Sequence, residues 1–153
     1  MTHPESYLML LELIAVVCAG LFAGAAIYIS LVEHPARLEC GTALAATEFV
    51  PSYRRAALMQ ASLAAVGFLA ALAAAFQGRG LPVLLAGVLL GLVIPFTLLV
   101  IVPTNQRLLD PALDRGSTEA AGLLSRWGRL HAVRSAMGAI AFGVLAWDLA
   151  RPT

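Results

Sequence analysis

The sequence predicts an all-α integral membrane protein, a four-helix bundle whose helices run up and down in antiparallel order. Three observations predict it: the composition, four long apolar segments and the distribution of arginine. Of the 153 residues, 60% are hydrophobic and only 12% are charged, whereas an average soluble domain has about 25% charged residues. So few charged side chains cannot cover a soluble fold, and the lipid bilayer is therefore the expected solvent. The length fits one domain over residues 1–153.

Four apolar segments are each long enough to cross a bilayer, which takes about 20 residues of helix. The predicted spans cover residues 7–32, 56–76, 81–102 and 132–150. No basic region precedes the first span and no convincing cleavage site follows it, so we expect a retained helix and not a signal peptide. The short link at residues 77–80 suits a tight helical hairpin.

The arginines predict the orientation of the bundle. All ten basic residues are arginines, and eight of them lie in the two long connections or at the start of the fourth span: Arg37, Arg54, Arg55, Arg107, Arg115, Arg126, Arg129 and Arg134. Only Arg79 and Arg151 lie on the other side. The positive-inside rule then places the long connections in the cytoplasm and both termini in the periplasm. Arginine without lysine, in alanine-rich sequence, is typical of a GC-rich bacterial genome, so we expect a bacterial inner membrane protein.

The net charge, the cysteines and the glycines limit which partners we expect for this protein. The net charge of +1 gives no reason to expect a nucleic-acid partner. The two cysteines, Cys18 and Cys40, form no CxxC motif and are too far apart along a helix for a disulfide, which argues against a thiol–disulfide reductase. The pairs Gly20/Gly24 and Gly87/Gly91 have GxxxG spacing, which lets helices approach closely. Packing within one chain is the ordinary use of this motif, and a homo-oligomer through the same faces is the alternative.

Polar side chains gather where the first and third spans end, on the predicted cytoplasmic side. Glu33 and His34 close the first span, and Asn105 follows the third. If the first helix continues past Pro35, then Ser30, His34 and Arg37 share one of its faces. Asn105 offers an amide that both donates and accepts hydrogen bonds, although it would equally serve to cap the next helix.

The start of the fourth span carries the most informative pattern. Trp127, His131 and Arg134 stand at i, i+4 and i+7, and therefore lie on one face of a helix. Arg134 falls about one turn inside the span, where a charge is costly unless it is paired or hydrated. We expect Glu33 as its partner, and the alternative is that Arg134 reaches out to the lipid headgroups.

The two histidines do not decide which cofactor the protein binds, if it binds one. His34 and His131 would meet if their helices pack together, and two imidazoles with a carboxylate suit a metal ion or haem. No single helix has HxxxH or ExxH spacing, however, and His131 would equally be an interfacial histidine. No cofactor, haem and a metal ion therefore all remain open. Tyr53, next to two arginines, would contact a substrate or anchor the interface.

Four stretches, in their order and spacing, resemble the anthrone oxygenase-like family of small four-span membrane proteins. They are residues 32–37, 51–55, 102–108 and 126–134, and the resemblance extends over nearly the whole chain. Some fungal members of this family oxidise anthrones to anthraquinones. The resemblance implies a site at Asn105, Trp127, His131 and Arg134, with Glu33 and His34 fitting the bacterial variant. It implies no particular cofactor.

Two classes of function follow. The first is a membrane oxidoreductase or oxygenase for a lipid-soluble anthrone- or quinol-like aromatic, in which His131 or His34 acts as general base. Arg134 and Asn105 would then stabilise an oxyanion, Glu33 would orient His34 or Arg134, and Trp127 and Tyr53 would contact the substrate. The alternative is a non-catalytic membrane protein that binds a small ligand, haem or metal, or an accessory subunit. A transporter fits less well, because the centres of the spans lack polar groups.

Overall fold

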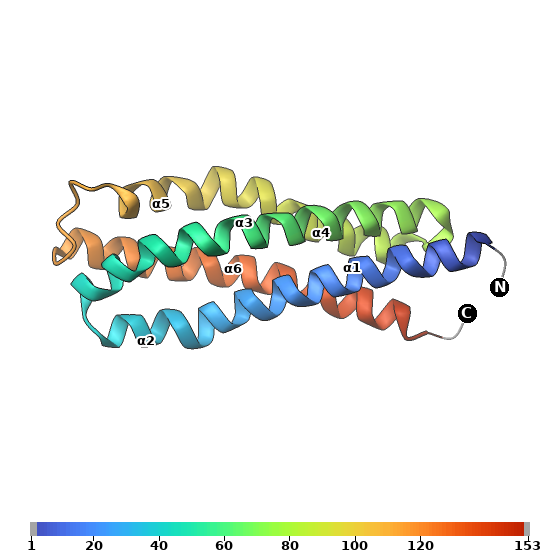
Figure 1. Ribbon diagram of the computed structural model, residues 1–153, viewed down its shortest axis with the longest axis horizontal. Helices are drawn as coiled ribbons and strands as arrows, with labels where there is room; N and C mark the ends of the chain where they lie inside the picture. Colours follow the sequence, from blue (N-terminus) through green and yellow to red (C-terminus); the bar gives the residue numbers. More distant parts are fainter. Residues whose placement is uncertain (1–2, 152–153) are drawn as a thin grey trace.

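The protein is a bundle of four long, antiparallel helical rods (Figure 1), seen in a computed structural model that describes residues 3–151. The described part is all-α, with four helices long and apolar enough to cross a membrane, which confirms the predicted fold class. In chain order the elements are α1 (His3–Tyr28), η1 (Ile29–Glu33), α2 (His34–Glu39), α3 (Thr42–Ala74), η2 (Ala75–Arg79), α4 (Leu81–Phe96), η3 (Thr97–Ile101), α5 (Val102–Leu109) and α6 (Thr118–Leu149). The protein is therefore a multi-pass membrane protein.

The helices extend well beyond the predicted spans at one end of the bundle, which we call the arginine-rich end. The first connection is almost entirely helical, because α1 continues through η1 into α2 and α3 already begins at Thr42. Only a turn at Cys40 and Gly41, where Gly41 has φ +90°, separates them. α6 begins at Thr118, where the Ser117 hydroxyl accepts a hydrogen bond from the N–H of Ala120 as an N-cap. Hydropathy marks the apolar part of a helix, and these helices continue into polar sequence.

Two of the rods contain a π-helical turn directly before a proline. The π-turns η1 and η3 end two residues before Pro35 and Pro103, respectively. In each case the residue before the proline donates its N–H five residues back, from His34 to Ile29 and from Val102 to Thr97. Proline has no N–H and its ring crowds the carbonyl four residues earlier, so the helix widens instead of breaking. The first helix thus persists past Pro35, and Pro103 stands in the first turn of α5.

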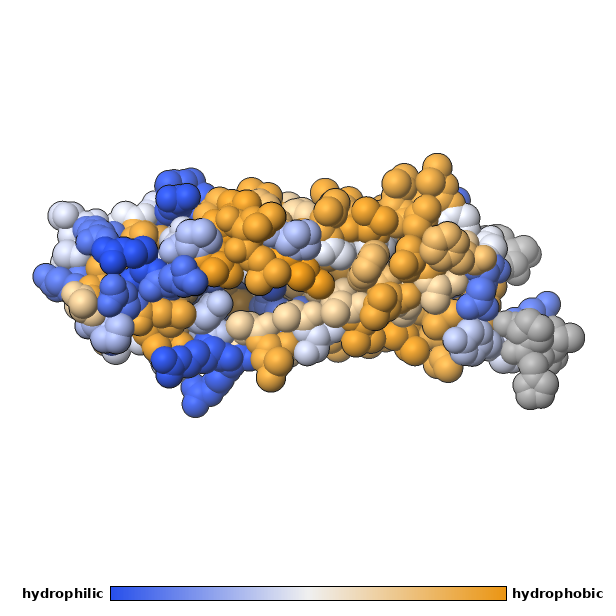
Figure 2. Space-filling model, turned by 90° about the horizontal axis from the view of Figure 1, so that it is seen from above, coloured by the Kyte–Doolittle hydropathy of each residue, from blue (hydrophilic) through white to orange (hydrophobic). Residues whose placement is uncertain are grey.

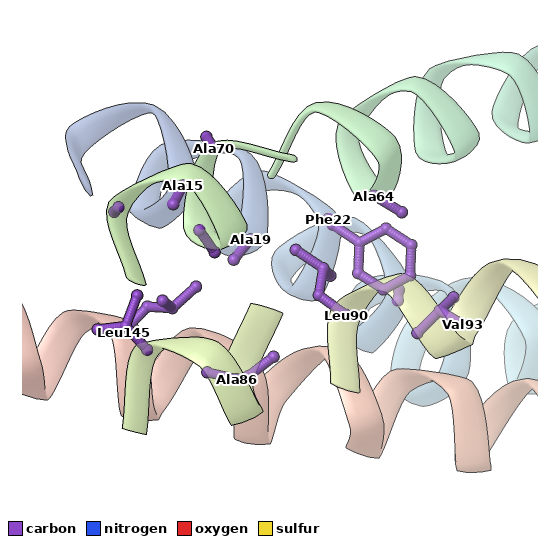
Figure 3. Close-up of a cluster of buried hydrophobic side chains, with 14 residues drawn as sticks. Ala15, Ala19, Phe22, Ala64, Ala70, Ala86, Leu90, Val93 and Leu145 are labelled. Carbon is purple, nitrogen blue, oxygen red and sulfur yellow. The ribbon is translucent and has the colours of Figure 1, made fainter. Parts of the chain in front are cut away.

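Small residues pack the half of the bundle near the chain termini, which we call the terminal half. α1 packs on α3 and α6, and α4 packs on the same two helices. Alanines from all four rods form one core cluster with Phe22, Leu90 and Val93. Figure 3 shows several of them, with Ala64 close to Phe22. Since lipid is as apolar as leucine, close van der Waals contact has to hold the helices together. A Cβ on Gly87 would lie 2.8 Å from Ala71, and one on Gly91 would lie 2.8 Å from Phe68.

The GxxxG glycines therefore pack mainly within the chain. Besides Gly87 and Gly91, Gly20 lies under the Phe142 ring, 2.9 Å from the position of a Cβ. Gly24 differs, because no described atom of its surroundings lies within 4 Å of that position. Packing of a second copy on this face remains a prediction.

The arginine-rich half has a different core. Its buried side chains are larger and include Phe49, Leu108, Leu124 and Trp127. The surface follows the same division: an apolar band covers the terminal half and the middle, and hydrophilic residues cover the arginine-rich end (Figure 2). Exposed leucines such as Leu69, Leu85 and Leu99 belong to the helices that carry this band.

Candidate functional site

A cavity of about 120 Å³ lies inside the bundle where the arginine-rich half meets the apolar band. All four rods line it. The polar lining residues are Glu33, Arg37, Ser52, Tyr53, Gln60, Thr97, Asn105, Trp127, His131 and Arg134. The apolar ones are Ile29, Phe49, Ala56, Ala57, Ala61, Ala64, Val93, Ile94, Leu98 and Ile101. A mostly apolar pocket with a few converging polar groups is the usual form of a small-molecule site.

One face of α6 supplies the aromatic and basic wall of the cavity. Trp127, His131 and Arg134 line it together, as their helical spacing predicts. The indole of Trp127 stacks on the imidazole of His131, with ring centroids 4.6 Å apart and planes at 24°. Phe49 from α3 meets the same indole edge-on at 5.3 Å. These contacts fix the plane of the His131 ring, which is only 2% exposed.

The hydrogen-bond partners of His131 favour one tautomer of its ring. Its Nε2 lies 3.4 Å from a guanidinium nitrogen of Arg134, and arginine can only donate. Nε2 is therefore the unprotonated nitrogen of a neutral imidazole, and Nδ1 carries the hydrogen. Nδ1 then donates to the Ser30 hydroxyl at 3.0 Å, Ser30 donates to Ser135 at 2.8 Å, and Ser135 donates to the Ala26 carbonyl at 3.0 Å. Every member of the chain has a partner in this arrangement.

Arg134 is held without an acidic partner. No carboxylate of the described residues forms a salt bridge with it, and its Nε has no hydrogen-bond partner among them. Its guanidinium instead lies over the ring of Phe22, 4.9 Å from the centroid, and against His131. The predicted ion pair between Glu33 and Arg134 is therefore wrong.

Glu33 belongs to a separate polar network that borders the cavity at its arginine-rich end. Its carboxylate accepts hydrogen bonds from Arg37, one helical turn later, and from Ser52 of α3 at 2.7 Å. Arg37 also pairs with Glu48 at 2.9 Å and lies near the Trp127 ring, 5.9 Å from its centroid. Arg37 and Ser52 thus hold the Glu33 carboxylate within this network, and it forms no salt bridge with Arg134. The network ties α2 to α3 beside the cavity.

His34 lies behind Trp127 and does not line the cavity. Its ring contacts the indole at 5.0 Å and packs against the backbone of Gly128, where a Cβ would lie 2.5 Å from Nε2. His34 and His131 thus both contact Trp127, and His131 has Ser30 on one nitrogen and a cation beside the other. Among the side chains of residues 5–151, no group of three or more His, Cys, Asp or Glu is arranged to hold a metal ion.

Asn105 and Tyr53, two of the predicted site residues, both line the cavity. Asn105 is 1% exposed and its Oδ1 has no partner in the described part of the chain. It lies inside the first turn of α5, which has no side-chain cap, so the capping alternative is wrong. Tyr53 stacks on Phe49, with centroids 5.7 Å apart and planes at 9°. Both side chains face the space that Trp127 and His131 face.

Among the polar cavity and support residues that the sequence reasoning missed are Gln60, Ser135, Thr97 and Ser52. Gln60 is 1% exposed and lines the cavity. Ser135 connects the hydrogen-bond chain of His131 to the Ala26 carbonyl. The available signal was a single amide or hydroxyl within an otherwise apolar span, because such a group needs a partner there.

One side of the cavity opens toward the apolar band. α3 packs closely on α4 but makes almost no contact with η3. Two lining residues at this gap are exposed on the outer surface, Ala61 of α3 and Leu98 of η3, and Leu98 is 60% exposed. Figure 2 shows a hollow within the apolar band, with hydrophilic atoms at its bottom. The opening therefore lies within the apolar band of the surface.

The fold and the site together define a class: a four-span helical membrane protein with an internal cavity that carries an imidazole, an unpaired guanidinium and two amides. The family model for anthrone oxygenase matches residues 49–144, well over half of the chain. The anthrone oxygenase tpcL of Aspergillus fumigatus is 32% identical over 133 residues, which cover 79% of this chain and 81% of the relative. The chain belongs to the anthrone oxygenase family. No solved structure matches it.

The matched region contains most of the site. Residues 49–144 include Tyr53, Gln60, Asn105 and the α6 face, whereas Glu33 and His34 lie before the match. The relative is fungal, so a bacterial inner membrane and periplasmic termini remain predictions.

Proposed function

We propose that the protein is a membrane oxygenase that oxidises a flat, lipid-soluble aromatic of the anthrone kind inside the cavity. The observation that carries the proposal is the pair formed by Arg134 and His131: a guanidinium without a carboxylate, beside the unprotonated nitrogen of an imidazole. A charge within a membrane bundle needs a reason, and an anion formed from a bound substrate would supply it. Family membership supports the reaction class.

The pair is suited to removing a proton from an O–H group. An anthrone has a carbonyl on one side of its central ring and a methylene on the opposite side, and its enol tautomer carries the hydrogen on oxygen. Nε2 of His131 and the nearest nitrogen of Arg134 are 3.4 Å apart, so both would reach one substrate oxygen. His131 would take the proton as general base, and Arg134 would hold the resulting oxyanion. Because the imidazole and the guanidinium lie side by side, the proton would be removed at this oxygen and not at the methylene across the ring.

The aromatic anion would then react with dioxygen, the oxidant that the proposal requires. The methylene carbon forms a double bond to one oxygen atom. Its two hydrogens leave with the other oxygen atom as water, so dioxygen accepts the four electrons that the carbon loses. The product is the corresponding quinone. This balance needs no other reductant or oxidant.

The remaining residues would bind and orient the substrate. Trp127, Phe49 and Tyr53 offer aromatic faces to a flat ring system. The Asn105 amide would bind a polar substituent, since its Oδ1 lacks a partner among the described residues. His34, held between Gly128 and Trp127, would support the indole and not act as the base. Glu33 and Arg37 would close the arginine-rich end of the cavity.

Turnover in lipid vesicles tests the proposal. Wild-type protein with anthrone should consume oxygen and form quinone above the rate of protein-free vesicles. His131→Gln and Arg134→Gln should each lower this rate by about a hundredfold or more, the usual effect of losing a general base or an oxyanion donor. Arg129→Gln is the matched control, because Arg129 is an exposed arginine of the same helix that bonds only to Ser125.

Folding has to be monitored in the same samples, by helicity and thermal unfolding in detergent. The proposal is wrong if His131→Gln is folded and oxidises anthrone at the wild-type rate. It is equally wrong if Arg129→Gln loses as much activity as Arg134→Gln, because the effect would then follow net charge and not the cavity.

A further inference from the structure

Gln60 is the least satisfied polar side chain of the cavity. It is 1% exposed, and neither its Oε1 nor its Nε2 has a hydrogen-bond partner among residues 3–151. Its neighbours along the cavity-facing side of α3 are Ala57, Ala61 and Ala64, which offer no side-chain partner. Leaving a buried amide unpaired costs about 1–3 kcal/mol. A residue that only filled space here would be apolar.

The depth of Gln60 follows from the helix register. α3 and α6 both start at the arginine-rich end and run in the same direction (Figure 1). Phe49 and Trp127 touch, so they mark one level. At about 1.5 Å per residue, Gln60 lies roughly 16 Å beyond Phe49 and Arg134 roughly 10 Å beyond Trp127. Counted along the backbones, Gln60 therefore lies about 6 Å deeper in the bundle than Arg134.

We infer that Gln60 is a specificity-determining residue that binds the oxygen atom added to the substrate, on the ring edge opposite the oxyanion held by Arg134. This inference rests on the proposed function and says where in the cavity the second substrate oxygen is bound. With the first oxygen at Arg134 and His131, the carbon to be oxidised faces the deeper end of the cavity. The Nε2 amide hydrogens of Gln60 donate to the oxygen that becomes bonded to this carbon. The Oε1 atom accepts from the water that leaves.

The assignment explains why the amide has no protein partner. A substrate methylene cannot form a strong hydrogen bond, whereas the new carbonyl oxygen can accept one. Gln60 therefore distinguishes a ring system with one oxygen from the same ring system with two. A site built to bond an oxygen loses affinity for the analogue that lacks it.

Binding under nitrogen tests the inference without turnover. In a Trp147→Phe background, the fluorescence of Trp127 reports occupancy of the cavity, because Trp127 lines it. Wild-type protein should bind anthraquinone more tightly than anthrone. Gln60→Met, which keeps the length and removes the amide, should weaken anthraquinone binding about tenfold and leave anthrone binding unchanged, as expected for one lost hydrogen bond. Ser62→Ala is the control, since Ser62 is exposed on α3 and bonds only to its own helix.

Two outcomes would overturn the inference. One is a wild-type protein that binds anthrone and anthraquinone equally, a result that needs no folded variant. The other is a Gln60→Met protein that loses both ligands in equal measure, because Gln60 would then only shape the cavity. Both can occur while anthrone is still turned over in air, so they leave the proposed function standing. Absence of binding for either ligand would overturn both proposals.

Discussion

The two halves of the bundle differ in whether a buried charged side chain has a partner of opposite charge. In the terminal half, Glu12 of α1 is 5% exposed and pairs with Arg79 after α3. In the arginine-rich half, Arg134 has no carboxylate among the described residues and lies beside a cavity. A paired charge ties two helices together, whereas an unpaired charge beside an empty space is available to a ligand. The comparison separates the structural ionic group from the functional one.

The packing of the helices also differs between the two halves. Alanine and glycine let the helix backbones touch in the terminal half and leave little space between them. The arginine-rich half instead has larger buried rings, such as Phe49 and Trp127, and the π-turn η3 beside the cavity. The cavity therefore lies where the alanine-rich helix α3 faces large rings and a widened helix.

Removing one arginine from each half should give the largest contrast. Arg79→Leu leaves the Glu12 carboxylate buried without its partner, and we expect a loss of up to about 3 kcal/mol in the free energy of unfolding. Arg134→Leu should lose activity but no stability, because no ion pair is broken. Unfolding in mixed micelles, followed by helicity, measures both. The comparison fails if Arg134→Leu is the less stable variant.

A double variant sharpens the same contrast. Glu12→Leu combined with Arg79→Leu should regain most of the stability that Arg79→Leu loses, because both charges leave the apolar region together. If the double variant is as unstable as the single one, the pair is not the reason for the loss.

Gly128→Ala should give the next largest effect, and it should appear in the site. A Cβ at this position would lie 2.5 Å from Nε2 of His34, so the imidazole and the Trp127 ring behind it have to move. We expect a destabilisation of about 1–3 kcal/mol with reduced turnover. Gly122→Ala, on the same helix with no described atom within 4 Å, should be neutral or slightly stabilising. Equal effects of the two substitutions would show that His34 adapts freely.

Ala61→Phe should restrict the opening of the cavity toward the apolar band. The new ring would fill the gap between α3 and η3, because Ala61 lines the cavity and is exposed on the outside. We expect severalfold slower binding of anthrone from lipid vesicles, measured by stopped-flow fluorescence, with little loss of stability. Val66→Phe, at an exposed position on the same helix outside the cavity lining, is the control. An unchanged binding rate would mean that ligands use another route.

The smallest effect should follow Ser135→Ala. The substitution ends the hydrogen-bond chain from His131 through Ser30 to the Ala26 carbonyl. A hydrogen bond between membrane helices contributes about 0.6 kcal/mol on average and at most about 1.7 kcal/mol. We therefore expect turnover to fall about threefold, and by no more than about twentyfold. His131 would remain able to accept a proton. A complete loss of activity in a folded Ser135→Ala protein would give the serine a direct role that this geometry does not assign.

Residues that depend only on helical periodicity were predictable from the sequence. Trp127, His131 and Arg134 share one face because of their spacing, and this holds whatever the neighbouring helices do. Ser30, His34 and Arg37 likewise all reach the α6 side chains, since the first helix does persist past Pro35.

Partners across helices were not predictable in the same way. Glu33 was expected to meet Arg134, but Arg37 lies one turn away on its own helix and Ser52 faces it from α3. The rotation of each helix about its axis decides such pairs, and the π-turn at Ile29–Glu33 sets that rotation for the first helix. Gln60 was missed because hydropathy averages a single amide into its alanine-rich surroundings.

The gap between α3 and η3 has a consequence for how the protein would meet its ligand. A ligand that arrives through it is dissolved in the acyl chains, and the concentration that matters is its mole fraction in the membrane. Saturation curves plotted against total molarity would then shift whenever the amount of phospholipid changes. The same curves, plotted per lipid molecule, would coincide.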